Sequence, residues 1–129
     1  MIVVDASVVL DALVATGGTH TRLAGEDLAA PHLLDAEVAN ALRSRNRTGD
    51  LDAVSAHRAL TDLAALEVER FSHVHLLTRV WELRDNLTVY DALYVALAEA
   101  LDIPLVTLDT RTAAAPGTTA VIEVLPRYT

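Results

Sequence analysis

The chain has 129 residues, 52% of them hydrophobic, and this length predicts one domain with a single core over residues 1–129. It contains no cysteine, no basic leader and no apolar run near the roughly 18 residues that span a membrane, which excludes disulfides and thiolate metal sites and favours a cytoplasmic protein. The net charge of −8 argues against broad electrostatic attraction to nucleic acid, and all 10 basic residues are arginine.

The first half of the chain predicts a buried strand, a helix, a short helix or loop, a short strand before Pro31 and two longer helices: residues 2–4, 7–15, 19–27, 28–34, 35–49 and 50–66. The first segment is a strand because its three apolar residues leave no face for solvent. In the segment 35–49, Val38 and Leu42 recur at helical spacing, with Asp35 placed to cap the start and Gly49 to stop the end.

The second half predicts a strand, two helices and two further strands: residues 67–72, 73–85, 88–101, 103–109 and 120–125. Leu77 and Trp81 stand four residues apart in the first of these helices, which suits contacts in the core or between two copies of the chain. Strands separated by helical segments favour a parallel sheet with helices on both faces.

Four acidic residues are predicted to meet at one edge of this sheet. Asp5 and Asp109 each follow an apolar strand, and ligand sites in open α/β sheets lie outside the carboxyl ends of the strands. Glu37 and Asp91 fall in the first turns of helices that begin at the same edge. Carboxylates so placed repel one another, and oxygen ligands with few nitrogen or sulfur ligands nearby suit Mg²⁺ or Mn²⁺. The pattern therefore predicts a divalent metal site.

Each carboxylate also has a purely structural explanation. Asp5 could cap the helix that follows it, and Asp109 could open a turn. Asp91 stands three residues after Thr88, the spacing of a capping box, and Glu37 complements its helix dipole. These explanations account for the residues one at a time, whereas a metal site accounts for all four. Three polar neighbours could hold a water molecule or a carboxylate there, although surface or capping roles explain each alone: Ser7, Asn40 and Thr107.

The order and spacing of these motifs resemble a known family. The segments VVDASVVLDAL, DAEVANALR, TVYDALYVALAEAL and LVTLDTR look like the four acidic motifs of PIN-domain ribonucleases, specifically the VapC-type toxins of type II toxin–antitoxin systems. The resemblance covers essentially the whole chain and implies a three-layer α/β/α sandwich around a central, mainly parallel sheet. It also implies a Mg²⁺- or Mn²⁺-dependent endoribonuclease toxin that acts on RNA, inhibits translation, forms a homodimer and is neutralised by a cognate VapB-like antitoxin.

The resemblance also implies roles for individual residues. By matching motif, the catalytic and metal-binding roles fall to Asp5, Glu37, Asp91 and Asp109, with Ser7, Asn40 and Thr107 as auxiliary residues. The cation would hold a phosphodiester oxygen and activate a water molecule for in-line attack on phosphorus. Neither the number of ions nor the identity of the RNA follows from the motifs.

Three arginines near the end of the predicted helix 35–49 are candidates for RNA binding: Arg43, Arg45 and Arg47. At about 100° per residue, Arg45 and Arg47 lie about 80° to either side of Glu37 and could clamp phosphates that flank the scissile bond. The same side chains would also balance the helix dipole, and both explanations stay open.

Other functions fit the sequence less well. A phosphoacceptor domain or an aspartate phosphatase relies on a lysine, which the chain lacks, and a nucleotide site would need a glycine-rich turn or P-loop. Two alternatives remain open: a catalytically degenerate PIN-like binding module, and a DNA-directed metal nuclease with nearly the same chemistry.

Overall fold

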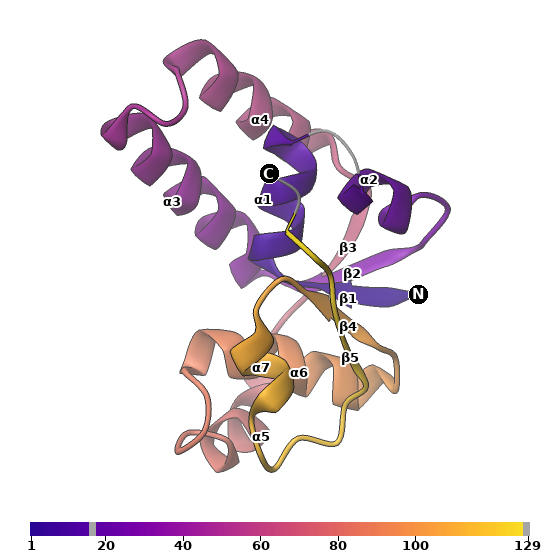
Figure 1. Ribbon diagram of the computed structural model, residues 1–129. Coiled ribbons are helices and arrows are strands. Elements are labelled where there is room, and N and C mark those ends of the chain that lie inside the picture. Colours follow the sequence, from indigo (N-terminus) through magenta and orange to yellow (C-terminus); the bar gives the residue numbers. More distant parts are fainter. Residues whose placement is uncertain (16–17, 128–129) are drawn as a thin grey trace.

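The computed structural model describes residues 1–15 and 18–127, over which strands and helices alternate (Figure 1). The elements are β1 Ile2–Val4, α1 Ala6–Val14, α2 Gly18–Leu23, β2 Leu28–Pro31, α3 Leu33–Thr48, α4 Ala53–Ala65, β3 Val68–Phe71, the 3₁₀ helix η1 Val74–Leu76, α5 Leu77–Glu82, α6 Val89–Leu101, β4 Leu105–Thr107, α7 Thr110–Ala114 and β5 Ile122–Val124. None of the helices in these ranges combines the length and the apolar character needed to cross a membrane.

The strands form one five-stranded parallel sheet in the order β3-β2-β1-β4-β5. In the centre, Val3 of β1 pairs with Ala29 of β2 on one side and with Leu105 of β4 on the other. The chain order reverses between β1 and β4, so the carboxyl ends of these two strands flank the point where open α/β sheets bind ligands. The predicted α/β architecture is confirmed.

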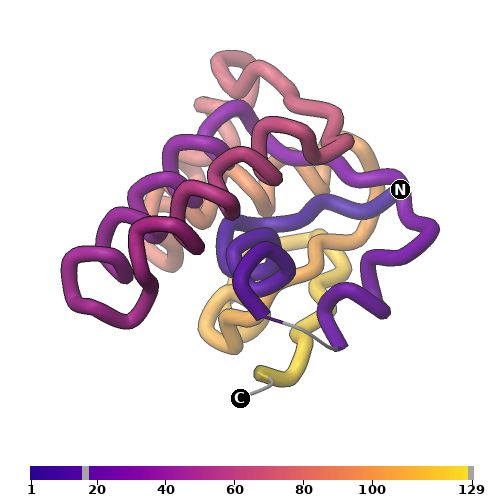
Figure 2. Tube along the Cα trace, turned by 90° about the horizontal axis from the view of Figure 1, so that it is seen from above, coloured from indigo at the N-terminus to yellow at the C-terminus, as the bar shows by residue number. Residues whose placement is uncertain are grey.

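Helices cover both faces of the sheet. Figure 1 shows α1, α3 and α4 on one side of the strands and α5 and α6 on the other, and α6 packs against β1, β2 and β4. Figure 2 shows α3 and α4 running side by side and extending beyond the strands. Helix α6 is enclosed by the sheet and its neighbouring helices, so its residues 92–98 are all buried. Asp91 therefore stands at the border between a buried helix and solvent.

The predicted start of α3 was wrong. The helix begins directly after His32 rather than at Asp35, because the fully buried Leu34 anchors its first turn in the core. Asp35 lies within that turn and forms an ion pair with Arg70 of β3 at 2.7 Å. The predicted end is confirmed, since Gly49 takes the left-handed conformation at φ 84° that ends many helices.

The prediction of one continuous helix over 73–85 was also wrong. The segment divides into η1 and α5 and a turn after them, with Leu76, Val80 and Leu83 as its buried residues. Leu77 and Trp81 are 46% and 63% exposed, which excludes the core explanation for them. A contact between two copies of the chain stays a prediction for both.

Candidate active site

Asp5 lies at the sheet's switch point, directly after β1. Its Oδ1 accepts hydrogen bonds from the Val8 backbone N–H (3.1 Å), which caps α1, and from the Ser7 hydroxyl (2.6 Å). Its Oδ2 accepts a short hydrogen bond from the Thr107 hydroxyl on β4. Asp5 therefore caps α1 and also connects the end of β1 to β4 through the hydrogen bond from Thr107.

Ser7 and Thr107 also hold the chain that leaves β4. The Leu108 N–H donates to Ser7 Oγ at 3.1 Å, and the Asp109 N–H donates to Thr107 Oγ1 at 3.0 Å. Both hydroxyls thus touch the Asp5 carboxylate and the segment that carries Asp109. Ser7 and Thr107 therefore lie beside the acidic residues, and their auxiliary role stays a prediction.

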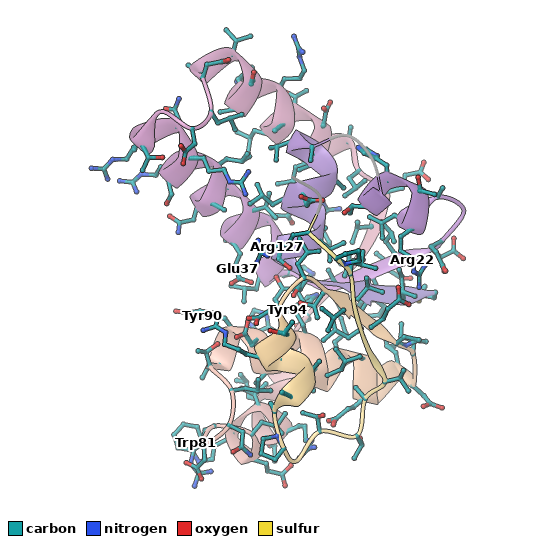
Figure 3. The ribbon with its side chains drawn as sticks, viewed as in Figure 1. Arg22, Glu37, Trp81, Tyr90, Tyr94 and Arg127 are labelled. Carbon is teal, nitrogen blue, oxygen red and sulfur yellow. The ribbon has the colours of Figure 1, made fainter. Side chains whose placement is uncertain are left out.

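Glu37 and Tyr94 connect α3 with α6 across the same end of the sheet. The Tyr94 hydroxyl donates to Glu37 Oε1 at 2.6 Å, and Figure 3 shows both residues in the middle of the molecule, where α3 and α6 approach each other. Tyr94 is only 2% exposed, and a buried tyrosine hydroxyl needs a partner. Tyr94 was not among the residues predicted from the sequence, although a hydroxyl one helical turn after Asp91 in an apolar run was a usable signal.

Burial and mutual repulsion raise the pKa of three carboxylates. For Asp5, burial raises the pKa most and the charge of Asp91 adds to it, while its hydrogen bonds oppose both. Burial likewise raises the pKa of Glu37, with further increases from Asp91 and Asp5. Burial and the charge of Asp109 raise the pKa of Asp91. These carboxylates are close enough for the negative charge of one to raise the pKa of another.

Asp109 differs from the other three carboxylates. Its side chain caps α7 by accepting from the Arg111 N–H (2.9 Å), and the Arg111 guanidinium donates to both of its oxygens at 3.2 Å. Arg111 is the main reason that the pKa of Asp109 lies below its ordinary value. Asp109 therefore caps α7, and its charge also acts on the nearby Asp91.

The oxygen ligands of these carboxylates suit a divalent cation, but the distances between their side chains do not yet form a site for one ion. Burial is the main cause of the raised pKa values and neighbouring negative charge adds to it, and Mg²⁺ or Mn²⁺ would supply positive charge to these oxygen ligands. Within residues 1–15 and 18–127, however, no three acidic or histidine side chains are close enough together to hold one ion. Arg111 is hydrogen-bonded to Asp109, and Tyr94 is hydrogen-bonded to Glu37. To bind a cation, the carboxylates of Asp109 and Glu37 would have to exchange these partners for it.

The remaining predicted residues lie along α3. Asn40 is exposed one turn beyond Glu37, and its side chain has no hydrogen-bond partner in the part of the chain that the structure describes. At 1.5 Å per residue, Arg43, Arg45 and Arg47 follow Glu37 by about 9 to 15 Å along the helix axis. They are exposed or half-buried near the end of α3, away from the carboxylates.

Comparison with known proteins identifies the family. The PIN domain family model matches residues 2–117. Ribonuclease VapC9 of Mycobacterium tuberculosis is 46% identical over 127 residues, which cover 98% of this chain and 100% of VapC9. Ribonuclease VapC1 of the same species is 47% identical over 128 residues, which cover 95% of this chain and 96% of VapC1.

Solved structures share the fold. PAE2754 from Pyrobaculum aerophilum has a TM-score of 0.72 and 28% identity, covering 94% of this chain and 87% of its own. A toxin–antitoxin complex from Klebsiella pneumoniae contains a chain with a TM-score of 0.75 at 16% identity, covering 98% of this chain and 100% of that one. The chain therefore belongs to the PIN-domain family, in which it is similar to VapC ribonucleases.

Proposed function

We propose that this protein is a metal-dependent endoribonuclease toxin that hydrolyses phosphodiester bonds in RNA, inhibits translation and is neutralised by a VapB-like antitoxin. One observation carries the proposal: in a chain 46–47% identical to VapC ribonucleases, the carboxylates of Asp5, Glu37 and Asp91 are near enough for their charges to act on one another, and all three have raised pKa values. Carboxylates in such a group favour a bound divalent cation over remaining unpaired.

Asp5, Asp91 and Asp109 would hold Mg²⁺ or Mn²⁺, with Glu37 as a further ligand directly or through water. When bound, the cation supplies positive charge to a phosphodiester oxygen and lowers the pKa of a water molecule. Ser7 and Thr107 orient Asp5 through their hydroxyl groups, and Tyr94 orients Glu37. Asn40 stays a predicted helper, and Arg43, Arg45 and Arg47 stay predicted RNA contacts.

The proposed partners are RNA, the antitoxin and a second copy of the chain. The toxin–antitoxin complex from Klebsiella pneumoniae, which shares the fold, supports the antitoxin as a partner. The exposed Leu77 and Trp81 give a copy an apolar surface to bury, and Figure 3 shows Trp81 at the end of the molecule away from Glu37. Sedimentation equilibrium of the purified chain checks the dimer, and a monomer at all concentrations contradicts it. The cytoplasmic location stays a prediction.

The decisive experiment is cleavage of total RNA by the purified, antitoxin-free protein with Mg²⁺ or Mn²⁺ and with EDTA. We expect cleavage that EDTA abolishes and that Asp5→Asn and Asp91→Asn each reduce at least about 100-fold, since a metal ion contributes several kcal/mol to such a reaction. Asp62→Asn, an exposed aspartate on α4, is the matched control and should cleave like the wild type.

The outcomes separate the two alternatives. A folded wild-type protein that binds Mn²⁺ and RNA but cleaves neither RNA nor DNA would be a degenerate binding module. Cleavage of single-stranded DNA at a rate equal to that of RNA of the same sequence would indicate a DNA-directed nuclease or a nuclease without sugar preference, because the 2′-hydroxyl distinguishes the two substrates.

A further inference from the structure

A cavity of about 560 Å³ opens beside Asp109, between the start of α7 and the segment that follows β5. Its walls come from two stretches that meet only in the folded chain, residues 108–111 and 124–127. This volume suits a nucleotide-sized ligand. Arg111 and Arg127 both line the cavity and are exposed, so it presents positive charge on a protein whose net charge is −8.

The cavity adjoins the proposed catalytic carboxylates. Asp109 lines the cavity, and its charge reaches Asp91. Arg111 and, more weakly, Arg127 act electrostatically on Asp109 from the cavity side. In the view of Figure 3, Arg127 lies in the middle of the molecule, as Glu37 and Tyr94 do. A strand of RNA held at the carboxylates would therefore pass over or beside these two arginines.

Arg111 can exchange its partner at little cost. Its guanidinium donates to both oxygens of Asp109 at 3.2 Å, but its side chain is 90% exposed. Ion pairs that exposed contribute little to stability. Arg127 forms no ion pair with any carboxylate of the described residues. Both guanidinium groups can therefore donate to an incoming phosphate, which they recognise by two parallel hydrogen bonds.

Other arginines are committed to the fold. Three of them form paired hydrogen bonds to both oxygens of a carboxylate on another element: Arg22 with Glu123, Arg70 with Asp35 and Arg79 with Glu99. Their side chains are only 26–32% exposed. Breaking such a pair would leave a half-buried charge, so these residues are poor candidates for binding a ligand.

We propose that Arg111 and Arg127 form a phosphate-binding subsite that holds the RNA strand next to the scissile bond. The inference rests on the proposed ribonuclease function and deepens it, because it assigns the backbone of the substrate to two arginines rather than to the acidic residues themselves. It also explains how an acidic protein meets a polyanion through a local contact instead of its overall charge.

The test is the affinity of each variant for a short, fluorescein-labelled single-stranded RNA, measured by fluorescence anisotropy in EDTA over a series of NaCl concentrations. We expect Arg111→Ala and Arg127→Ala each to raise Kd about 3-fold or more and the double variant about 10-fold. The slope of log Kd against log salt should fall by about 0.7 for each arginine replaced, since each would neutralise one phosphate. Arg58→Ala removes a charge that is also exposed, from α4 and outside the cavity, and is the matched control.

Lysine variants add a second comparison. Arg111→Lys and Arg127→Lys keep the charge and should keep the salt slope, but they should bind less tightly because lysine cannot form the paired hydrogen bonds. Alanine variants that match Arg58→Ala in both Kd and salt slope would overturn the subsite, even in a protein whose RNA cleavage depends on its carboxylates. A protein that loses RNA binding in these variants but never cleaves would refute the proposed activity and support the subsite.

Discussion

The individual carboxylates combine structural and proposed catalytic roles. Asp5 caps α1 and Asp109 caps α7, as their positions in the sequence allowed, and both lie near Asp91 as well. The two explanations therefore do not compete. A cap must stand at a helix start, and in a parallel sheet the helix starts lie at the edge where ligands bind.

Tyr94→Phe tests the link between α3 and α6 at single-residue scale. The change removes one oxygen, keeps the ring, and leaves Glu37 without its donor at 2.6 Å. We expect the free energy of unfolding at pH 7 to fall by about 1–2 kcal/mol, because a buried hydrogen bond to a charged group is removed. Urea unfolding measures it.

The matched control is Tyr90→Phe. Tyr90 lies on the same helix but is 59% exposed, so its change should stay within about 0.5 kcal/mol of the wild type. Equal stability of the two variants would show that the Tyr94 hydroxyl does not stabilise the fold.

At the scale of elements, local sequence determined the segments that carry the site. The apolar run of β1 and the apolar helix α6 are evident from the sequence because each is buried on every side and shows little amphipathic pattern. The start of α3 was missed because Leu34 fixes it, and the burial of Leu34 depends on helices and strands distant in the sequence. A capping signal at Asp35 could not outweigh that packing.

Thr88→Ala tests whether the start of α6 positions Asp91. The Thr88 hydroxyl accepts the Asp91 N–H at 3.1 Å, so its removal should cost about 1 kcal/mol of unfolding free energy. Because the first turn would fray, we also expect weaker Mn²⁺ binding by isothermal titration calorimetry. Thr88→Ser keeps the hydroxyl and should restore both values. An alanine variant with full Mn²⁺ affinity would separate the cap from the site.

At the scale of the whole molecule, the carboxylate group opposes folding at neutral pH. The pKa of Asp91 is raised above the 3.8 of an unperturbed aspartate, so between these two values the native state binds more protons than the unfolded chain. The free energy of unfolding therefore falls as pH rises through that window. The cost is fully present above the raised pKa of Asp91 and absent well below pH 3.8.

Asp91→Asn should therefore stabilise the protein at pH 7 in EDTA, by on the order of 0.5 kcal/mol once solvent screening is allowed for. The difference should vanish as the pH falls below about 4. With Mn²⁺ at about 100 times its Kd the order should reverse, since the wild type gains about 2.7 kcal/mol from binding. Thermal unfolding measures both effects.

Asp62→Asn is again the control. Its difference in unfolding free energy from the wild type should be the same at pH 7 and below about pH 4, and the same with and without Mn²⁺. An Asp91→Asn protein less stable than the wild type at pH 7 in EDTA would contradict the repulsion. Equal stabilisation of both proteins by Mn²⁺ would place the cation elsewhere.

The sequence by itself determined the α/β class, the order of the strands and helices and the motifs that carry the acidic residues, because burial and helix capping leave local patterns in the chain. Only the tertiary structure decided the strand order that brings β1 beside β4, the bond from Tyr94 to Glu37 and the meeting of Arg111 with Arg127. These contacts join residues far apart along the chain. Local patterns do not record them, because the packing of the whole molecule selects such pairs.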